Sequence, residues 1–227
     1  MATSNKIHLR LATNEDVDSI VHVMSRSFQH NAAFVDIFYP DHDTPSGHAQ
    51  AIQTFQSYWQ NYKSHADLVV ATTTTKDSEE IIGFALWTYM SSSINLSPPT
   101  LAFSPFAKTE DDAEFAKQVW KSFVVPRRSA VLEAEKSHPG TGLWVLEYLA
   151  VDPGHQRKGA GRELVQWGLD KARKDATEAI VEGTPPGQPC YRACGFKTVI
   201  KEMEYVVEER FEGRRLPEIA FMRHPCR

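Results

Sequence analysis

The sequence predicts a single α/β domain over residues 7–223, built on a twisted, mixed sheet of about six or seven strands flanked by helices. Three observations predict this fold class. Short apolar or alternating runs, which are typical of strands, are interleaved with longer stretches of helical periodicity. One apolar run, residues 143–150, continues through a glycine-rich loop into a helical pattern. The 227 residues, of which 41% are hydrophobic, are enough to bury one large core without a second domain.

The N-terminal third predicts one strand and two helices. Residues 7–11 alternate like a short strand, and Thr13 is placed as a helix N-cap with Asp16 three residues later. The apolar residues that follow share one helical face (Val17, Ile20, Val21, Met24 and Phe28). Residues 29–47 mix aromatic and turn-forming residues, and we expect a looser stretch there. A second helix is expected over about 48–63, with an aromatic stripe on one side (Phe55, Tyr58, Trp59 and Tyr62).

The rest of the chain predicts further strands and helices around the glycine-rich loop. Residues 68–71 and 81–87 read as an antiparallel hairpin, and residues 111–136 are broadly helical apart from a break expected at Pro126. After the loop, a helix is expected from about Arg162 to Lys174. The strand at 179–182 should run parallel to 143–150, because a helix connects the two. Two late strands are expected near 202–207 and 218–223.

The loop between residues 151 and 162 is shaped to hold an anion. It lies at a predicted helix N-terminus, where free backbone N–H groups and the helix dipole favour phosphate. Gly159 and Gly161 let the backbone approach a ligand, because a Cβ there would fill ligand volume or disfavour positive φ. Arg157, Lys158 and Arg162 add positive charge. The spacing fits neither a P-loop nor a dinucleotide fingerprint, which argues against a dinucleotide-dependent oxidoreductase.

The loop residues Gln156-Arg157-Lys158-Gly159-Ala160-Gly161 resemble the Q/R-x-x-G-x-G/A loop of the GCN5-related N-acetyltransferase (GNAT) family. The Leu-Ala-Val-Asp-Pro run before the loop and the Tyr191-to-Phe196 block after it resemble two further family blocks in the same order. The resemblance implies a GNAT-type acyl-CoA N-acyltransferase fold with acetyl-CoA as co-substrate. Relative to the family, residues 91–140 are an insertion between two central strands, and we weigh it as a wall or lid over the acceptor site or as a helical decoration.

The resemblance also implies where the cofactor lies. The pyrophosphate should be held by the loop, and the pantetheine arm by the backbone of the strand before it, in the gap that opens toward the parallel neighbour. The implied cofactor-binding residues are Leu149, Ala150, Val151, Gln156, Arg157, Lys158, Gly159, Ala160, Gly161 and Arg162.

Two residues are candidate catalytic groups, and two others are candidates for the acceptor site. Tyr191 precedes Gly195-Phe196 and resembles the family tyrosine that donates a proton to the departing thiolate, with packing as the alternative. Glu147 is the candidate general base, since strand alternation puts Val145, Glu147, Leu149 and Val151 on one face. A solvent-facing or Arg-paired Glu147 is the alternative. Phe34 and Trp59 are candidates for the acceptor pocket.

Composition narrows the function classes. A net charge of −4 gives no basic surface for nucleic acid, and no stretch approaches the about 18 apolar residues of a membrane span. Three cysteines suit a reducing compartment, so we expect a cytoplasmic protein. Cys190 and Cys194 lack further ligands, and the nine histidines show no H-x-x-x-H helix pairing with an acid. We therefore expect no metal.

The expected activity is transfer of an acetyl group from acetyl-CoA to a primary amine, by direct attack in a ternary complex. We favour a small-molecule amine over a protein acceptor, and the sequence does not identify it. Two alternatives stay open: a non-catalytic acyl-CoA sensor, and a protein N-terminal or lysine acetyltransferase. The oligomeric state stays open as well.

Overall fold

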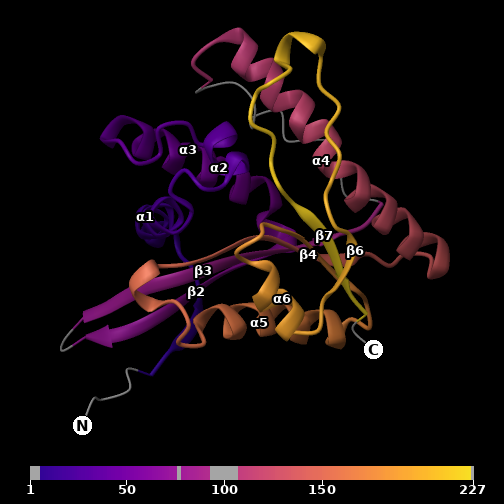
Figure 1. The fold of residues 1–227 in the computed structure, drawn as a ribbon. Coiled ribbons are helices and arrows are strands. Elements are labelled where there is room, and N and C mark those ends of the chain that lie inside the picture. The colour runs from indigo at the N-terminus through magenta and orange to yellow at the C-terminus, as the bar shows by residue number, and fades with distance from the viewer. Residues whose placement is uncertain (1–5, 76–77, 93–106, 226–227) are drawn as a thin grey trace.

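A computed structural model describes residues 6–75, 78–92 and 107–225 of the chain. Within these residues, seven strands form one sheet in the order β1-β2-β3-β4-β5-β7-β6 (Figure 1). The strands are β1 (His8–Leu11), β2 (Ala66–Thr75), β3 (Ser78–Met90), β4 (Leu143–Val151), β5 (Ala179–Gly183), β6 (Lys197–Ile200) and β7 (Ala220–His224). Only β4 and β5 pair in parallel. The mixed sheet with a parallel pair at the loop is therefore confirmed.

Helices cover both faces of the sheet (Figure 1). The first four, α1 (Val17–Phe28), α2 (Ala33–Phe38), α3 (Pro45–Tyr62) and α4 (Glu110–Ser137), lie on one side, here called the α4 face. This face buries, among others, Val70, Phe84, Val145, Ile180 and Phe221. On the opposite side, the α5 face, α5 (Ala160–Lys174) and α6 (Gln188–Ala193) cover Val69, Ala85, Leu146, Val181 and Met222. None of the helices in the described ranges is both long and apolar enough to cross a membrane.

The start of the first helix follows the predicted capping pattern. Thr13 N donates to Asp16 Oδ2 over 2.7 Å, and the two residues form a capping box around a 3-10 turn, Asn14–Asp16, that leads into α1. Arg10 donates to both Asp16 oxygens, at 2.7 and 2.9 Å. The end of β1 is thereby tied to the start of α1, so the local pattern also fixes how the chain enters the α4 face.

Three predictions about regular structure are wrong, and two of them concern residues 29–47 and 202–207. The stretch expected to be loose contains α2, whose buried Val35 and Phe38 pack into the α4 face. Residues 202–207 are not a strand, and β6 lies earlier in the chain. The reason lies in distant partners: Val206 N donates to Ser122 Oγ, and Glu208 N donates to Gln118 Oε1. Val206 and, just past the segment, Glu208 thus bond to side chains of α4, and the Met203 N–H donates to Ile219 O, just before β7 begins.

The helix of the predicted insertion continues through Pro126, where we expected a break. Proline removes one backbone hydrogen bond, but side chains on both sides of it are anchored in the core. Phe123 and Val124 precede Pro126, and Ala130 and Val131 follow it, all at most 5% exposed. Of the insertion, residues 93–106, with Leu101, Phe103 and Phe106, lie outside the described residues.

Candidate active site

The glycine-rich loop joins β4 to α5 and has the conformation of an anion site. Gly159 is the N-cap of α5 with φ 104°, and a Cβ built there meets nothing within 4 Å. The prediction of positive φ is thus confirmed for Gly159. Gly161 does not have positive φ, and a Cβ on it would make ordinary contacts with Cys190 Sγ at 3.6 Å and with Val151, so for Gly161 only the predicted need for ligand volume remains. Gly161 therefore has no conformational need to be glycine.

Side chains around this loop hold it in place and leave positive charge at its surface. Gln156 Nε2 donates to Val151 O over 3.0 Å, and Lys158 Nζ donates to Gly154 O over 2.8 Å. The first intrahelical bond runs from Glu163 N to Gly159 O, so the N–H groups before it have no partner within the helix. With the exposed cations Arg157 and Lys158 beside them, they fit a pyrophosphate.

Strands β4 and β5 separate beyond a short parallel ladder. The ladder joins Trp144 to Ala179 and ends at the pair Leu146 and Val181. β4 continues to Val151, pairing only with β3, and β5 continues to Gly183, pairing only with β7. The edge of β4 that carries Leu149, Ala150 and Val151 therefore has no partner on the β5 side. This is the opening in which the sequence predicts the pantetheine arm.

Glu147 is the extra residue of a β-bulge. Leu86 of β3 pairs with Tyr148 and Trp87 pairs with Leu146, so Glu147 has no partner on β3. A bulge shifts the alternation of side chains along its strand. Val145 packs on the α4 face, whereas Leu149 and Val151 pack against the α5 face. The predicted common face of Val145, Glu147, Leu149 and Val151 is therefore wrong.

The bulge turns Glu147 into a buried ion-pair network on the α4 face. Arg127 of α4 donates through Nη1 to Glu147 Oε1 and Oε2, at 2.8 and 2.9 Å. Its Nε and Nη2 donate to the two oxygens of Glu182 on β5, at 2.9 and 2.8 Å. All three side chains are at most 3% exposed. A single guanidinium thus bridges the two strands just past the end of their ladder.

Electrostatics around this network favour a carboxyl that can accept a proton. Burial raises the pKa of Glu147, and the positive charge of Arg127 opposes this only in part. Burial would lower the pKa of Arg127, but the two carboxylates hold it well above its usual range. The buried hydroxyl of Tyr58 has no hydrogen-bond partner within 3.5 Å among the described residues, and burial together with the charge of Glu147 raises its pKa.

Tyr191 lies at the same opening, on the opposite face of the sheet. It is 6% exposed, and its ring packs on Phe196 with centroids 6.0 Å apart. A Cβ on Gly183, the last residue of β5, would meet this ring at 3.0 Å. Because Glu182 and Gly183 are consecutive strand residues, their Cβ positions lie on opposite faces of the sheet. The Glu147 network and Tyr191 therefore flank the end of β5 from its two sides.

Burial raises the pKa of Tyr191, so its phenol keeps its proton. The neighbouring thiol of Cys190 has a pKa lowered to about 7, chiefly by a hydrogen bond from Cys194 and also by the charge of Arg157. The loop lies close to α6, because a Cβ on Gly161 would be 3.6 Å from Cys190 Sγ. The helix that carries Tyr191 and the loop that would hold a pyrophosphate are thus neighbours.

The two acceptor candidates, Phe34 and Trp59, both lie on the α4 face, but they have different surroundings and burial. Phe34 is partly buried, with its ring 4.7 Å from Phe123 and 4.6 Å from Phe38. Trp59 is 5% exposed and carries Lys63 over its ring at 5.3 Å. Phe34 therefore belongs to an aromatic group on α2 and α4, while Trp59 is a residue of the buried core.

Sequence reasoning gave Glu182 no role, placed Tyr58 only on the aromatic stripe, and weighed Arg127 only as a residue of the insertion that could select substrate charge. A signal for Arg127 was present: it lies four residues after Phe123 and four before Val131, on the apolar stripe of its helix. A charged residue on such a stripe needs a buried partner. The sequence does not say which acid provides it.

Comparisons with known proteins identify the family and the fold of the chain. A family model described as "Acetyltransferase (GNAT) family" matches residues 31–196. No curated protein sequence matches the chain significantly. Arylalkylamine N-acetyltransferase 2 from Aedes aegypti superposes with a TM-score of 0.64 at 14% identity, covering 98% of this chain and 100% of that one.

Two bacterial structures are also similar. One from Corynebacterium glutamicum, described as histone acetyltransferase HPA2 and related acetyltransferase, has a TM-score of 0.56 at 20% identity, covering 96% of each chain. The ribosomal-protein-S18-alanine N-acetyltransferase from Escherichia coli has a TM-score of 0.52 at 14% identity, covering 97% of this chain and 94% of that one. At these identities the structures establish the fold, and the family model spans most of the sequence. The chain therefore belongs to the GNAT family of acetyltransferases.

Proposed function

We propose that this acetyltransferase transfers the acetyl group of acetyl-CoA to the primary amine of a small-molecule acceptor, by direct attack in a ternary complex. The observation that carries the proposal is the opening between β4 and β5. It has the phosphate-binding loop at one end, and it is flanked by Glu147 on one face and Tyr191 on the other. These are the groups that amine acylation needs: a proton acceptor, a proton donor and an anchored thioester.

Each group has one task in this proposal. The loop residues from Gln156 to Arg162 hold the pyrophosphate, and the backbone of Leu149, Ala150 and Val151 aligns the pantetheine arm. Acetyl-CoA supplies the activated acetyl thioester. Glu147 accepts the amine proton, directly or through one water, on an oxygen lone pair that Arg127 leaves free. Tyr191 donates its proton to the leaving thiolate, for which a neutral phenol is required.

The charge of the buried network supports an amine as the acceptor. Two carboxylates, Glu147 and Glu182, share one guanidinium, which leaves net negative charge on the α4 face of the opening. A protonated amine is attracted to such a site and can lose its proton there. The aromatic group nearby, with Phe34 and Phe123, supports an acceptor with an apolar or aromatic body. The arylalkylamines in the name of the Aedes aegypti enzyme are of this kind.

Coenzyme binding is tested first. Gly159→Asp places a negative charge in the open space at the α5 N-terminus, and we expect calorimetry to show coenzyme A affinity reduced more than about tenfold, or about 1.4 kcal/mol. Gly213→Asp is the matched control, since Gly213 also has positive φ, 84°, with nothing within 4 Å of its Cβ. Equal affinities for the two variants would refute the cofactor site.

Chemistry is tested by release of free thiol from acetyl-CoA with a panel of arylalkylamines, polyamines and peptides. Tyr191→Phe and Glu147→Gln should each lower kcat about 100-fold or more while coenzyme affinity is kept. Tyr89→Phe is the control tyrosine, because its hydroxyl bonds to Gly142 N, outside the opening. Coenzyme binding without turnover of any amine would instead indicate an acyl-CoA sensor, and turnover of peptides alone a protein acetyltransferase.

A further inference from the structure

A histidine-rich cavity lies beside the loop that follows β4, outside the proposed catalytic groups. Its volume is about 660 Å³, and its lining includes His22, His30, His42 and His48, together with Pro153 from the start of the loop. His22 lies in α1 and His30 in the turn after it, while His42 lies between α2 and α3 and His48 lies in α3. The four histidines do not share one helix or strand, so it is the tertiary fold that brings their imidazoles around one cavity.

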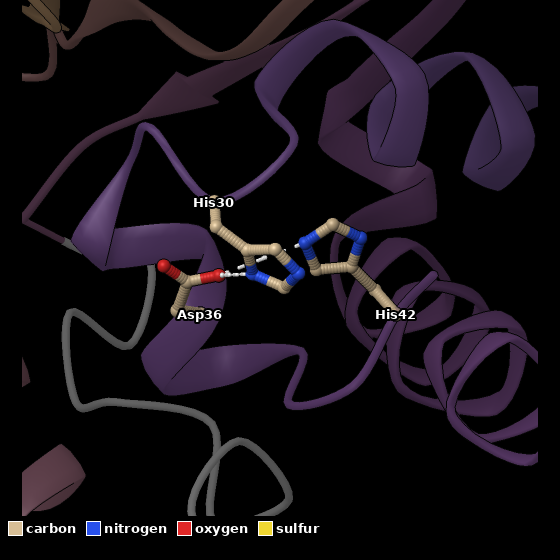
Figure 2. Close-up of side chains that lie close together, drawn as sticks. All are labelled: His30, Asp36 and His42. Carbon is tan, nitrogen blue, oxygen red and sulfur yellow. Dashed lines mark hydrogen bonds and ion pairs between the residues drawn. The ribbon is translucent and has the colours of Figure 1, made fainter. Parts of the chain in front are cut away.

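Two histidines at the wall of this cavity, His30 and His42, have donor atoms close to an oxygen of Asp36 (Figure 2). One nitrogen from each of His30 and His42 and one oxygen of Asp36 all lie within 4.8 Å of one another. His30 Nδ1 is 2.7 Å from Asp36 Oδ1, and His42 Nε2 is 3.7 Å from the same oxygen. In a tetrahedral zinc site with bonds of about 2.0–2.2 Å, ligand atoms are separated by about 3.3–3.6 Å. The two measured separations lie on either side of this range.

The other ring nitrogen of each histidine is held by an outer partner. His30 Nε2 is 3.2 Å from Asp43 Oδ2, and His42 Nδ1 is 2.7 Å from Ser25 Oγ, whose hydroxyl also donates to the carbonyl of His42. Such partners fix the tautomer of metal-bound imidazoles and turn the remaining nitrogen lone pair toward the ion. Here His30 Nδ1 faces Asp36 Oδ1, while His42 Nε2 faces the carbonyl of Gln29 and lies 3.7 Å from the same Asp36 oxygen.

The third ligand and its surroundings are held in place as well. Arg215, from the C-terminal part of the chain, donates to His30 O over 2.7 Å and to Asn31 O over 2.9 Å, and its Nη1 lies 3.6 Å from Asp36 Oδ2. Asp36 Oδ1 is thus left for the histidines. The carbonyl of Gln29 is 2.9 Å from His42 Nε2 and offers a fourth oxygen at the same point.

We propose that His30, Asp36 and His42 form a binding site for one divalent transition-metal ion of the zinc type. Two imidazoles and one carboxylate are a donor set that suits Zn²⁺ and its neighbours and excludes the all-oxygen sites of Mg²⁺ and Ca²⁺. The ion replaces the proton now shared between His30 and Asp36. It ties the turn after α1, helix α2 and the segment before α3 together, and so fixes the helix that carries Phe34. The site is structural and takes no part in acetyl transfer.

This proposal revises the expectation that no metal is bound. Sequence analysis searched for helical H-x-x-x-H spacing, whereas these ligands are spaced by six residues across a turn, a short helix and a loop. A spacing of six residues across a turn, a short helix and a loop does not predict that side chains lie close together. The three-dimensional arrangement of the two histidines and Asp36 is the only signal.

The test uses the full chain, stripped of metal with a chelator and titrated with Zn²⁺ against a chromophoric competitor. We expect about one ion per chain, a higher melting temperature with Zn²⁺, and a weakening of about 100-fold or more in His30→Asn and Asp36→Asn. His30 is 59% exposed, so its variant should keep the fold where a variant of the buried His42 can fail to fold. His48→Asn, from the same cavity, is the matched control and should bind like the parent.

Co²⁺ identifies the ligands by absorption. The expected spectrum has weak visible bands of nitrogen and oxygen coordination, and these are lost in His30→Asn. A strong thiolate band would place the ion on Cys190 and Cys194 and overturn the assignment. Zinc binding that survives in both His30→Asn and Asp36→Asn, or that is lost in His48→Asn, would overturn it too, as would the absence of binding to the parent.

Discussion

Replacing Arg127 by methionine isolates the energetic role of the buried network. Methionine has similar length and removes the guanidinium, leaving Glu147 and Glu182 facing each other with 3% and 2% exposure and no counter-charge. Removing one partner of a buried ion pair costs about 3–5 kcal/mol. For a chain of this size each kcal/mol lowers the melting temperature by about 2–4 °C, so we expect a fall of about 6–20 °C at pH 7.

The loss should depend on pH in a defined direction. Burial already raises the pKa of Glu147, and without Arg127 to oppose it the pKa rises further. A carboxyl whose folded pKa lies above its unfolded value favours folding below the unfolded value, about 4.3, and this contribution is lost as pH rises through the folded pKa. The difference between parent and variant should therefore be smaller at pH 5 than at pH 7.

The assay is urea and thermal denaturation followed by circular dichroism at both pH values. Arg128→Met is the matched control, because Arg128 is the exposed neighbour on the same helix, and it should change stability by less than about 0.5 kcal/mol. Adding Glu147→Gln and Glu182→Gln to Arg127→Met should restore much of the loss, since the buried charges then disappear together. A cost for Arg127→Met no larger than that for Arg128→Met, or losses that simply add in the triple variant, would refute this reasoning.

Three further perturbations test the packing and the caps. Gly168→Ala builds a Cβ 2.1 Å from the buried ring of Trp87, and we expect a destabilisation of about 2–3 kcal/mol in urea denaturation; a variant as stable as the parent would show that α5 can move away from β3. Hydrogen bonds from Arg10 hold the pKa of Asp16 below its usual range, so the stability they provide is present above about pH 4 and is lost as pH falls through the folded pKa. Asp16→Asn should therefore be less stable than the parent at pH 7, with the two converging in acid, and a constant difference would contradict this. Thr109→Ala removes the N-cap of α4, whose hydroxyl accepts from Asp112 N over 3.1 Å, and should cost about 1 kcal/mol by the same measurement; no loss would mean that water replaces the cap.

The elements that sequence patterns predicted well are those built on local contacts. The capping pair Thr13 and Asp16, the strand over 143–151 and the helix after Gly159 each depend on residues a few positions apart. The parallel direction of β5 also followed from the sequence, because a helix between two strands returns the chain to the same end of the sheet. The position of the glycine-rich loop between a strand and a helix belongs to this group, while the cofactor-binding role of its residues stays a prediction.

The predictions that failed depend on distant partners. Whether residues 202–207 form a strand was decided by Ser122 and Gln118 on α4, whose side chains bond to that backbone. Whether Pro126 ends its helix was decided by the buried residues on both sides of it. In each case local propensity gave one answer and tertiary contacts imposed another.

By itself, the sequence determined the family and the mixed sheet with a glycine-rich loop between β4 and α5. The cofactor-binding, acid and base roles that it assigns stay predictions. Only the tertiary structure decided what Glu147 contacts, because a single extra residue at the bulge moves every later side chain of β4 to the other face. It also decided that Arg127 lies between two glutamates, and that His30 and His42 meet at Asp36. Hydrogen bonds and ion pairs form only between side chains a few ångströms apart in space. Outside helices and strands, the spacing of residues along the chain does not predict which side chains come that close.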